Sequence, residues 1–255
     1  QNDLTDTADT ADTIEIPDTG DTADTPYPDD MIYTFERNGE TSVSNSGQSF
    51  RLALITELAS WLDSRQEALG TSWNPADTGS VLNDIDFYLQ FDSSIGGQIP
   101  FSFVSNSQEL VFDDISTGKN IIEKLAGNDP ATDHQDWTGG YFNGWTTGSP
   151  NSPEELLTYW STLYSEHVIN TGGAPTAGPV GDYSNVSITP DGHDLTTLIH
   201  TFLIMAVPFS QATDDYLDDD TDGKGLKADH STIVDDKNYT QLEHAWDEGF
   251  GYFGA

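Results

Sequence analysis

The chain has 255 residues, with 8 Lys and Arg against 44 Asp and Glu, and its formal net charge at pH 7 is -36. Such a surface repels nucleic-acid phosphates and anionic membrane lipids, so neither is expected as a primary partner. The absence of cysteine excludes thiol catalysis, thiolate zinc sites and disulfide bonds. The acidity suits cation binding, or an organism adapted to salt.

The first thirty residues form a polar, repetitive arm. Residues 1–30 repeat Asp-Thr-Ala or Asp-Thr-Gly, contain no basic residue and have little apolar surface to bury. We expect a disordered acidic linker over 1–30 and one helical domain over 31–255. Arms of this kind follow processed export signals, so the sequence predicts an exported protein of the periplasm or cell surface. No stretch approaches the roughly 20 apolar residues of a membrane span. The polar arm that starts at Gln1 would suit the tether of a lipoprotein if a lipid-modified cysteine preceded it, so we expect a lipid anchor rather than direct membrane insertion.

Apolar residues recurring at helical spacing predict helices over 46–69, 114–126, 152–168 and 193–217. The third begins with Ser-Pro-Glu-Glu, which supplies a capping oxygen, a first-turn proline and a glutamate three positions after the cap. The fourth is the most apolar and is interrupted at Pro208, so we expect it at the centre of the fold.

Aromatic alternation mixed with Gly, Pro and Asn marks the segment around 81–113, and it predicts short strands or an irregular insertion. Residues 128–150 and 172–190 are rich in Gly and are expected to be loops. The predicted fold class is therefore mainly α, a helical bundle with a β or irregular insertion around 81–113.

A run of aspartates follows the fourth predicted helix. Asp218, Asp220, Asp222 and Asp229 occupy positions 1, 3, 5 and 12 of a loop with Gly223 at position 6, the arrangement that wraps calcium in an EF-hand-like loop. The loop departs from that pattern because position 12 is Asp instead of Glu, and position 8 is Gly. Two interpretations stay open, a calcium site and an ordinary acidic turn.

The closing segment, 242–254, is expected to form an amphipathic helix. At about 100° per residue, one arc collects Glu243, His244, Asp247 and Glu248, and the other collects aromatic and apolar residues. The pairs Glu243–Asp247 and His244–Glu248 are four residues apart, a spacing that a divalent or ferric ion can bridge. These four residues are the candidate metal ligands; the alternative is a solvated acidic face.

Signatures of common enzymes are absent from the sequence. It contains no His-Glu-x-x-His, Gly-x-Ser-x-Gly, phosphate-binding glycine loop or dinucleotide fingerprint. Paired carboxylates occur throughout the chain, so they do not indicate glycoside hydrolysis. We therefore expect a binding protein rather than an enzyme.

Two blocks carry a family resemblance: Gly47-Gln48-Ser49-Phe50-Arg51-Leu52 and the closing segment that begins Leu242-Glu243-His244-Ala245-Trp246-Asp247-Glu248. Together and in this order they resemble an uncharacterised bacterial lipoprotein family, domain of unknown function 4856. Members of that family usually continue well past the second block, so the resemblance implies that this chain is truncated at its C-terminus.

That family is distantly similar to imelysin-like proteins, all-helical envelope proteins with a Gly-x-His-x-x-Glu motif and a role in iron uptake. Here His244 is followed by Asp247 instead of Glu, and Glu243 precedes it. The resemblance implies iron or zinc as the metal, with His244 and Asp247 as ligands and Glu243 and Glu248 as ligands or their hydrogen-bond partners.

The function predicted from the sequence is that of an exported, lipoprotein-like envelope protein of the periplasm or outer membrane. It would bind a metal cation for iron or divalent-metal acquisition and work with envelope transport proteins. One alternative is a metallopeptidase-like hydrolase in which Glu248 is the base beside a metal on His244. Another is a surface structural or adhesion protein stiffened by calcium.

Overall fold

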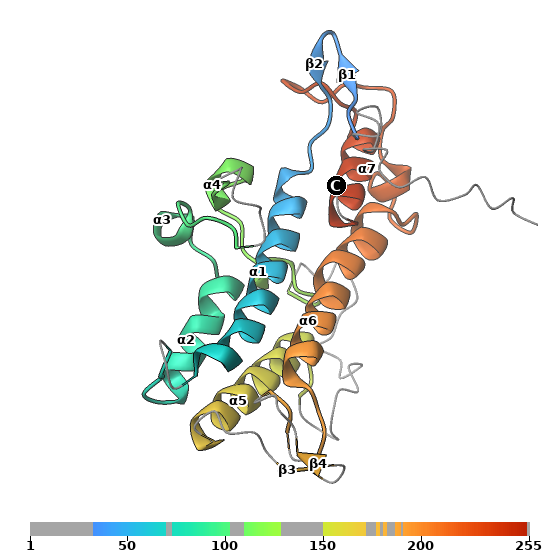
Figure 1. Cartoon of the computed structure of the whole chain (residues 1–255). Coiled ribbons are helices and arrows are strands. Elements are labelled where there is room, and N and C mark those ends of the chain that lie inside the picture. Colours follow the sequence, from blue (N-terminus) through green and yellow to red (C-terminus); the bar gives the residue numbers. More distant parts are fainter. Residues whose placement is uncertain are drawn as a thin grey trace, which may run out of the picture. The chain divides into compact units, whose positions relative to one another are not determined.

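The computed structural model describes residues 33–69, 73–102, 110–128, 150–171, 177–178, 181–182, 187–189 and 191–253. The chain divides into two compact units, 1–33 and 34–255. The predicted acidic linker over 1–30 lies outside the described residues. In the second unit, the described residues form seven α-helices and two small two-stranded sheets (Figure 1), which confirms the mainly α fold class.

Helix α1, Ser46–Ala68, is the longest α-helix of the described chain and contacts α2, α6 and α7. It runs beside α6 in Figure 1. The side chains of Phe50, Leu54, Leu58 and Leu62 recur every four residues and are almost fully buried. The predicted helix over 46–69 is confirmed, because its apolar stripe is the centre of the core.

The segment predicted as a β or irregular insertion begins instead with helix α2, Thr78–Leu89. Its buried residues are Val81, Ile85 and Leu89, spaced by four, and Asp77 caps the helix by accepting from the Ser80 amide. The partly buried aromatic residues between them look like strand alternation in the sequence, which explains the error. The described remainder holds only short helices, α3, Ser93–Gly96, and α4, Phe112–Ile115, and one isolated bridge, Pro100–Val111.

The helix predicted over 114–126 does not form as one element. Helix α4 ends at Ile115, and the next helical turn is the 3₁₀-helix η2, Ile122–Lys124. Gly118 lies between them with φ of 64°. Ser116 is already extended after α4, with φ of -163° and ψ of 160°, and the left-handed conformation of Gly118 keeps the chain from resuming the helix, because an α-helix requires negative φ throughout.

Helix α5, Pro153–Thr171, confirms the third predicted helix, and the Ser152 hydroxyl accepts from the Glu155 amide at 3.2 Å, as the sequence signal predicts. Helix α6, Leu195–Ile204, continues through two π-helical segments, η3, Met205–Phe209, and η4, Ala212–Tyr216. Pro208 lies in the first of them. A proline lacks the amide hydrogen that an α-helix needs, and the wider π turn accommodates this loss.

The run from Leu195 to Tyr216 is long and apolar enough to cross a membrane by length and composition. This corrects the expectation that no stretch approaches a span. Half of this apolar segment is buried inside the protein, and the core helices of soluble proteins are often equally long and apolar.

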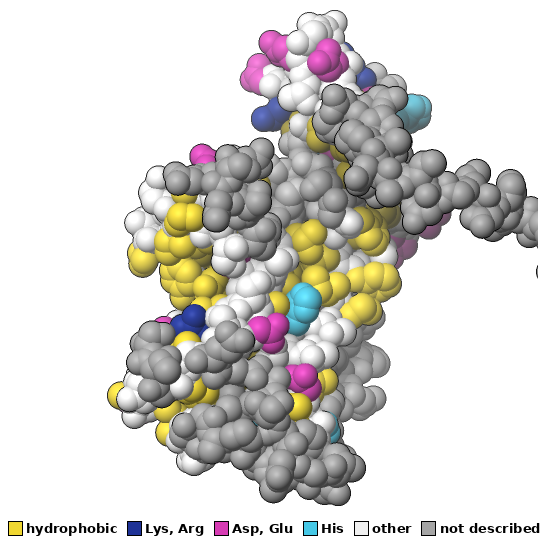
Figure 2. Space-filling view, viewed as in Figure 1, with side chains coloured by type: hydrophobic (Ala, Val, Ile, Leu, Met, Phe, Trp, Pro, Cys, Tyr) yellow, Lys and Arg dark blue, Asp and Glu magenta, His cyan; other side chains and the backbone are white. Residues whose placement is uncertain are grey.

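Figure 2 shows hydrophobic side chains over the middle of the viewed face and charged side chains over the β1–β2 hairpin.

The two sheets are both short antiparallel hairpins. Strand β1, Glu36–Arg37, pairs with β2, Glu40–Thr41, and β3, Ala177–Gly178, pairs with β4, Gly181–Asp182. Asn38 and Gly39, between β1 and β2, have φ of 57° and 81°. Two successive residues with positive φ form the turn type that suits a two-residue hairpin.

Helix α7, Gln241–Tyr252, confirms the predicted closing helix and packs against α1, η4 and the 3₁₀-helix η5, Gly225–Lys227. Thr240 and Glu243 form a capping box at its start. A Cβ atom on Gly251 would lie 2.8 Å from the Cβ of Asn45 and 2.9 Å from the Cβ of Gln48. The absence of a side chain at Gly251 therefore allows α7 to approach the start of α1 closely.

Gly251→Ala is expected to destabilise the protein by about 1–3 kcal/mol, because the added methyl group would meet Cβ and backbone atoms that cannot rotate away. Gly249→Ala is the matched control in the same helix: its methyl group would meet the side chain of Leu217, which can move. Urea unfolding of both variants gives the comparison. Equal stability of the two variants would show that the α1–α7 contact is not tight at Gly251.

Candidate functional site

Two of the four predicted metal ligands hold the N-terminal part of the domain against α7. Glu243 accepts from the Arg37 guanidinium at 2.7 Å through one oxygen and from the Thr240 amide at 2.7 Å through the other. Asp247 is 4% exposed and accepts from the Ser44 amide at 2.9 Å. Both carboxylates therefore accept hydrogen bonds that hold α7 in place.

The other two, His244 and Glu248, lie one turn apart with His244 Nε2 at 3.6 Å from Glu248 Oε2. Both line a cavity of about 320 Å³. We call this cavity the basic pocket; its lining residues are Ser44, Ser46, Gly47, Gln48, Arg51, Lys119, Lys124, Tyr216, His244 and Glu248. The structure thus brings one of the two predicted i,i+4 pairs into a concave site.

The carboxyl group of Glu248 is mostly buried, and its pKa is far from the ordinary value for a glutamate. The Gln48 side-chain amide donates to its Oε1 at 2.7 Å. Burial raises the pKa of Glu248 to about 7, the Gln48 hydrogen bond opposes this rise, Asp215 adds to it, and Lys124 and Arg51 oppose it. A carboxyl with this pKa is partly protonated at neutral pH.

His244 is held by an aromatic neighbour. Its ring stacks on Tyr239, with centroids 4.5 Å apart and planes at 16°. Burial lowers the pKa of His244, Asp247 raises it and Lys237 lowers it, and the net effect favours the neutral imidazole. Its Nδ1 atom is buried and has no hydrogen-bond partner among the described residues. A neutral imidazole keeps one nitrogen lone pair for a ligand.

Basic side chains gather at the same cavity. Arg51 is 5% exposed, and its guanidinium donates to the carbonyl oxygens of Asn120 at 2.7 Å and Gly47 at 3.3 Å. Lys119 precedes η2 and Lys124 ends it. Three of the eight Lys and Arg residues of the chain therefore line one pocket.

Sequence reasoning missed Lys119 and Lys124 because they belong to no motif. The sequence offered one signal for them: basic residues are rare in a chain with 44 acidic residues and 8 basic ones, yet these two lysines lie only five positions apart.

Within the ranges that the structure describes, no three His, Asp or Glu side chains gather as a metal site would require.

Two of the predicted calcium ligands interact with each other and two have other partners. Asp229 accepts from the Ser231 amide at 2.8 Å, and Asp222 lies 3.7 Å from the Lys227 ammonium. Burial and a hydrogen bond with Asp220 raise the pKa of Asp218 to about 6, and the charges of Asp220 and other aspartates add to the rise. The turn itself is present, with Gly223 at φ of 83°. Calcium binding by Asp218, Asp220, Asp222 and Asp229 stays a prediction.

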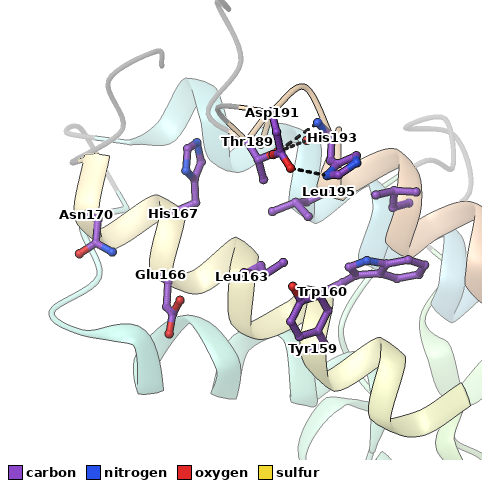
Figure 3. Close-up of a pocket in the computed structure, with 11 residues that line it drawn as sticks. Tyr159, Trp160, Leu163, Glu166, His167, Asn170, Thr189, Asp191, His193 and Leu195 are labelled. Atoms are coloured by element: carbon purple, nitrogen blue, oxygen red, sulfur yellow. Dashed lines mark hydrogen bonds and ion pairs between the residues drawn. The ribbon is translucent and has the colours of Figure 1, made fainter. Parts of the chain in front are cut away.

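A second cavity, of about 330 Å³, lies between α5 and the turn before α6 (Figure 3). Three of its polar residues interact with one another: the Thr189 hydroxyl donates to Asp191 at 2.5 Å, and His193 Nδ1 lies 3.3 Å from the other Asp191 oxygen. The His193 amide donates to the Thr189 hydroxyl at 3.0 Å. These bonds build the turn, so the basic pocket is the stronger candidate site.

The described domain is thus a mainly helical protein with a basic cavity between α1 and α7. Residues 159–255 match the model of a family described as Domain of unknown function (DUF4856). No curated protein and no solved structure matches the chain. The matched segment contains His244 and Glu248, whereas Arg51, Lys119 and Lys124 precede it. The lipoprotein and imelysin-like parts of the resemblance stay predictions.

Glu248→Gln is expected to change how stability depends on pH. The pKa of Glu248 is raised from 4.5 to about 7 in the folded protein, so the unfolded chain loses this proton first and wild-type stability falls between about pH 4.5 and pH 7. The variant lacks this proton. The free energy of unfolding of the variant, relative to that of the wild type, should increase by roughly 2–3 kcal/mol from pH 5 to pH 8, so the variant gains relative stability.

Urea unfolding of both proteins in EDTA at the two pH values measures this difference, because the other carboxyl groups titrate in both and cancel. Parallel pH profiles would place the pKa of Glu248 near its ordinary value.

Proposed function

We propose that the helical domain is a binding protein and that its ligand is a small solute with a carboxylate or phosphate group, held in the basic pocket. One observation carries the proposal: Arg51, Lys119 and Lys124, three of only eight basic residues, line one cavity in a chain of net charge -36. Elsewhere such a chain repels anions, so a local cluster of bases favours an anionic ligand at this place.

The start of α1 supports the same ligand class. Asn45, its N-cap residue, makes no side-chain capping bond in the described structure, and the first turn contains no acidic residue. By contrast, Asp77 caps α2 and Asp194 caps α6. The positive end of a helix attracts an anion, and Ser46, at the start of α1, lines the basic pocket.

The volume of the pocket suits a small ligand. Cavities that bind small molecules usually measure about 300–1,000 Å³, so a cavity of about 320 Å³ is at the small end of that range. The buried guanidinium of Arg51 is fixed by two carbonyl oxygens, which prepares one charge before the ligand arrives. Lys119 and Lys124 add flexible charges.

We place this binding protein in the cell envelope, where it would be exported, held by a lipid anchor and connected to envelope transport proteins. The composition of residues 1–30 supports this location, because a self-repelling acidic arm suits a spacer between an anchor and a domain. A metal cation, predicted from the sequence, is the second candidate ligand. The pair His244–Glu248 favours it, since the two side chains approach within 3.6 Å.

The double variant Lys119→Ala/Lys124→Ala tests the anionic ligand. Isothermal titration with sodium citrate and with sodium phosphate should show binding of at least one anion to the wild type, and at least a tenfold loss of affinity in the variant, because two of the three pocket charges are gone.

The matched control is Lys224→Ala/Lys227→Ala, which removes the same charge from the 218–229 loop, outside the pocket, and should bind as the wild type does. Equal losses in both double variants would mean that only net charge matters. No binding of either anion to the wild type would count against the proposal.

A further inference from the structure

The basic pocket combines a pair of metal donors with a cluster of positive charges, and neither a free anion nor a bare cation suits both. His244 and Glu248 are a donor pair suited to a metal cation, whereas Arg51, Lys119 and Lys124 repel one. A free anion would be attracted by the three positive charges but would leave the donor pair without a ligand. A bare cation would satisfy the pair and face three positive charges.

We infer that the ligand of the basic pocket is a metal chelate, a cation already complexed by a small polycarboxylate that carries surplus negative charge. This inference rests on the proposed function, because it names the kind of anion that the pocket binds. In the complex, the cation meets His244 and Glu248, and the free carboxylates of the chelator meet Lys119 and Lys124.

The number of protein donors supports a complexed cation. Four side chains of α7 could have contributed, but Glu243 is bound to Arg37 and Thr240, and Asp247 to Ser44. In the part of the chain that the structure describes, no third His, Asp or Glu side chain joins the pair in a group that could hold a metal. Zinc takes at least four ligands and iron commonly more, so two protein donors leave most coordination positions to another molecule.

The charges also favour a complex over a bare ion. Two lysines and one buried guanidinium line the pocket, and a divalent or trivalent ion that enters alone would meet them in a partly desolvated cavity. A chelate with net negative charge is attracted by the same groups. The bases then select the complex and exclude the free ion, which a strongly acidic protein surface would otherwise collect.

The test is a set of calorimetric titrations on the full chain after EDTA treatment and dialysis. The probes are sodium citrate alone, zinc chloride alone, and equimolar zinc citrate, with iron(III) citrate as a second complex. We expect at least one complex to bind at least tenfold more tightly than citrate alone. Because an acidic surface also holds zinc weakly, only binding that His244→Ala abolishes is assigned to the pocket.

The variants separate the two halves of the ligand. His244→Ala should reduce the affinity for the complex to that for citrate alone, and Lys119→Ala/Lys124→Ala should weaken both citrate and the complex. His230→Ala is the matched control, because His230 is exposed and does not line the pocket. Circular dichroism of each variant checks that the helices remain.

Three results would overturn the inference. Equal affinity for citrate and for both complexes would leave the proposed anion-binding function intact and remove the metal. Zinc that binds alone, tightly and through His244 would replace both proposals with a bare cation site. No binding of any probe to the wild type would count against the inference and the proposed function together.

Discussion

The close contact between α1 and α7 is the constraint on which the rest of the domain depends. It joins residues about two hundred positions apart: Asp247 accepts from Ser44, Glu248 accepts from Gln48, and Gly251 leaves room for the backbone at Asn45. Because the contact lies at the start of α1, it closes one wall of the basic pocket. Stability and the candidate site are therefore built from the same packing, and α7 cannot move without opening the pocket.

Charge explains why this place differs from the rest of the molecule. In a chain with 44 acidic residues, carboxylates are the common helix caps, as Asp77 and Asp194 show. The start of α1 lacks such a cap, and Arg51, Lys119 and Lys124 gather near it. A carboxylate in place of Asn45 would reduce the positive potential at the end of the helix. Its absence and the nearby bases therefore make the same local contribution, a positive electrostatic potential, which the proposed anionic ligand would use.

The sequence predicted the elements whose signal is local and missed those that depend on distant partners. Helix α1 and the capped start of α5 follow from spacing and capping residues, and the His244–Glu248 pair follows from helical geometry alone. Glu243 and Asp247 carry the same local pattern, but Arg37 and Ser44, more than two hundred positions earlier, engage them. The sequence of residues 81–89 resembles the alternating pattern of a strand, because large aromatic residues lie between the buried positions of helix α2.

The two engaged carboxylates also change what the remaining pair can do. If Glu243 and Asp247 were not engaged by Arg37, Thr240 and Ser44, four donors on one helix could hold a bare metal ion. The neighbouring bases would then only repel that ion. The use of the two carboxylates as structural anchors leaves an incomplete donor set inside a positively charged cavity. An incomplete set binds a metal firmly only when another molecule supplies the remaining ligands, and a positive cavity admits that molecule only when it is an anion. On the proposed function, the anchors that hold the hairpin and the start of α1 on α7 would thereby determine which class of ligand the pocket accepts.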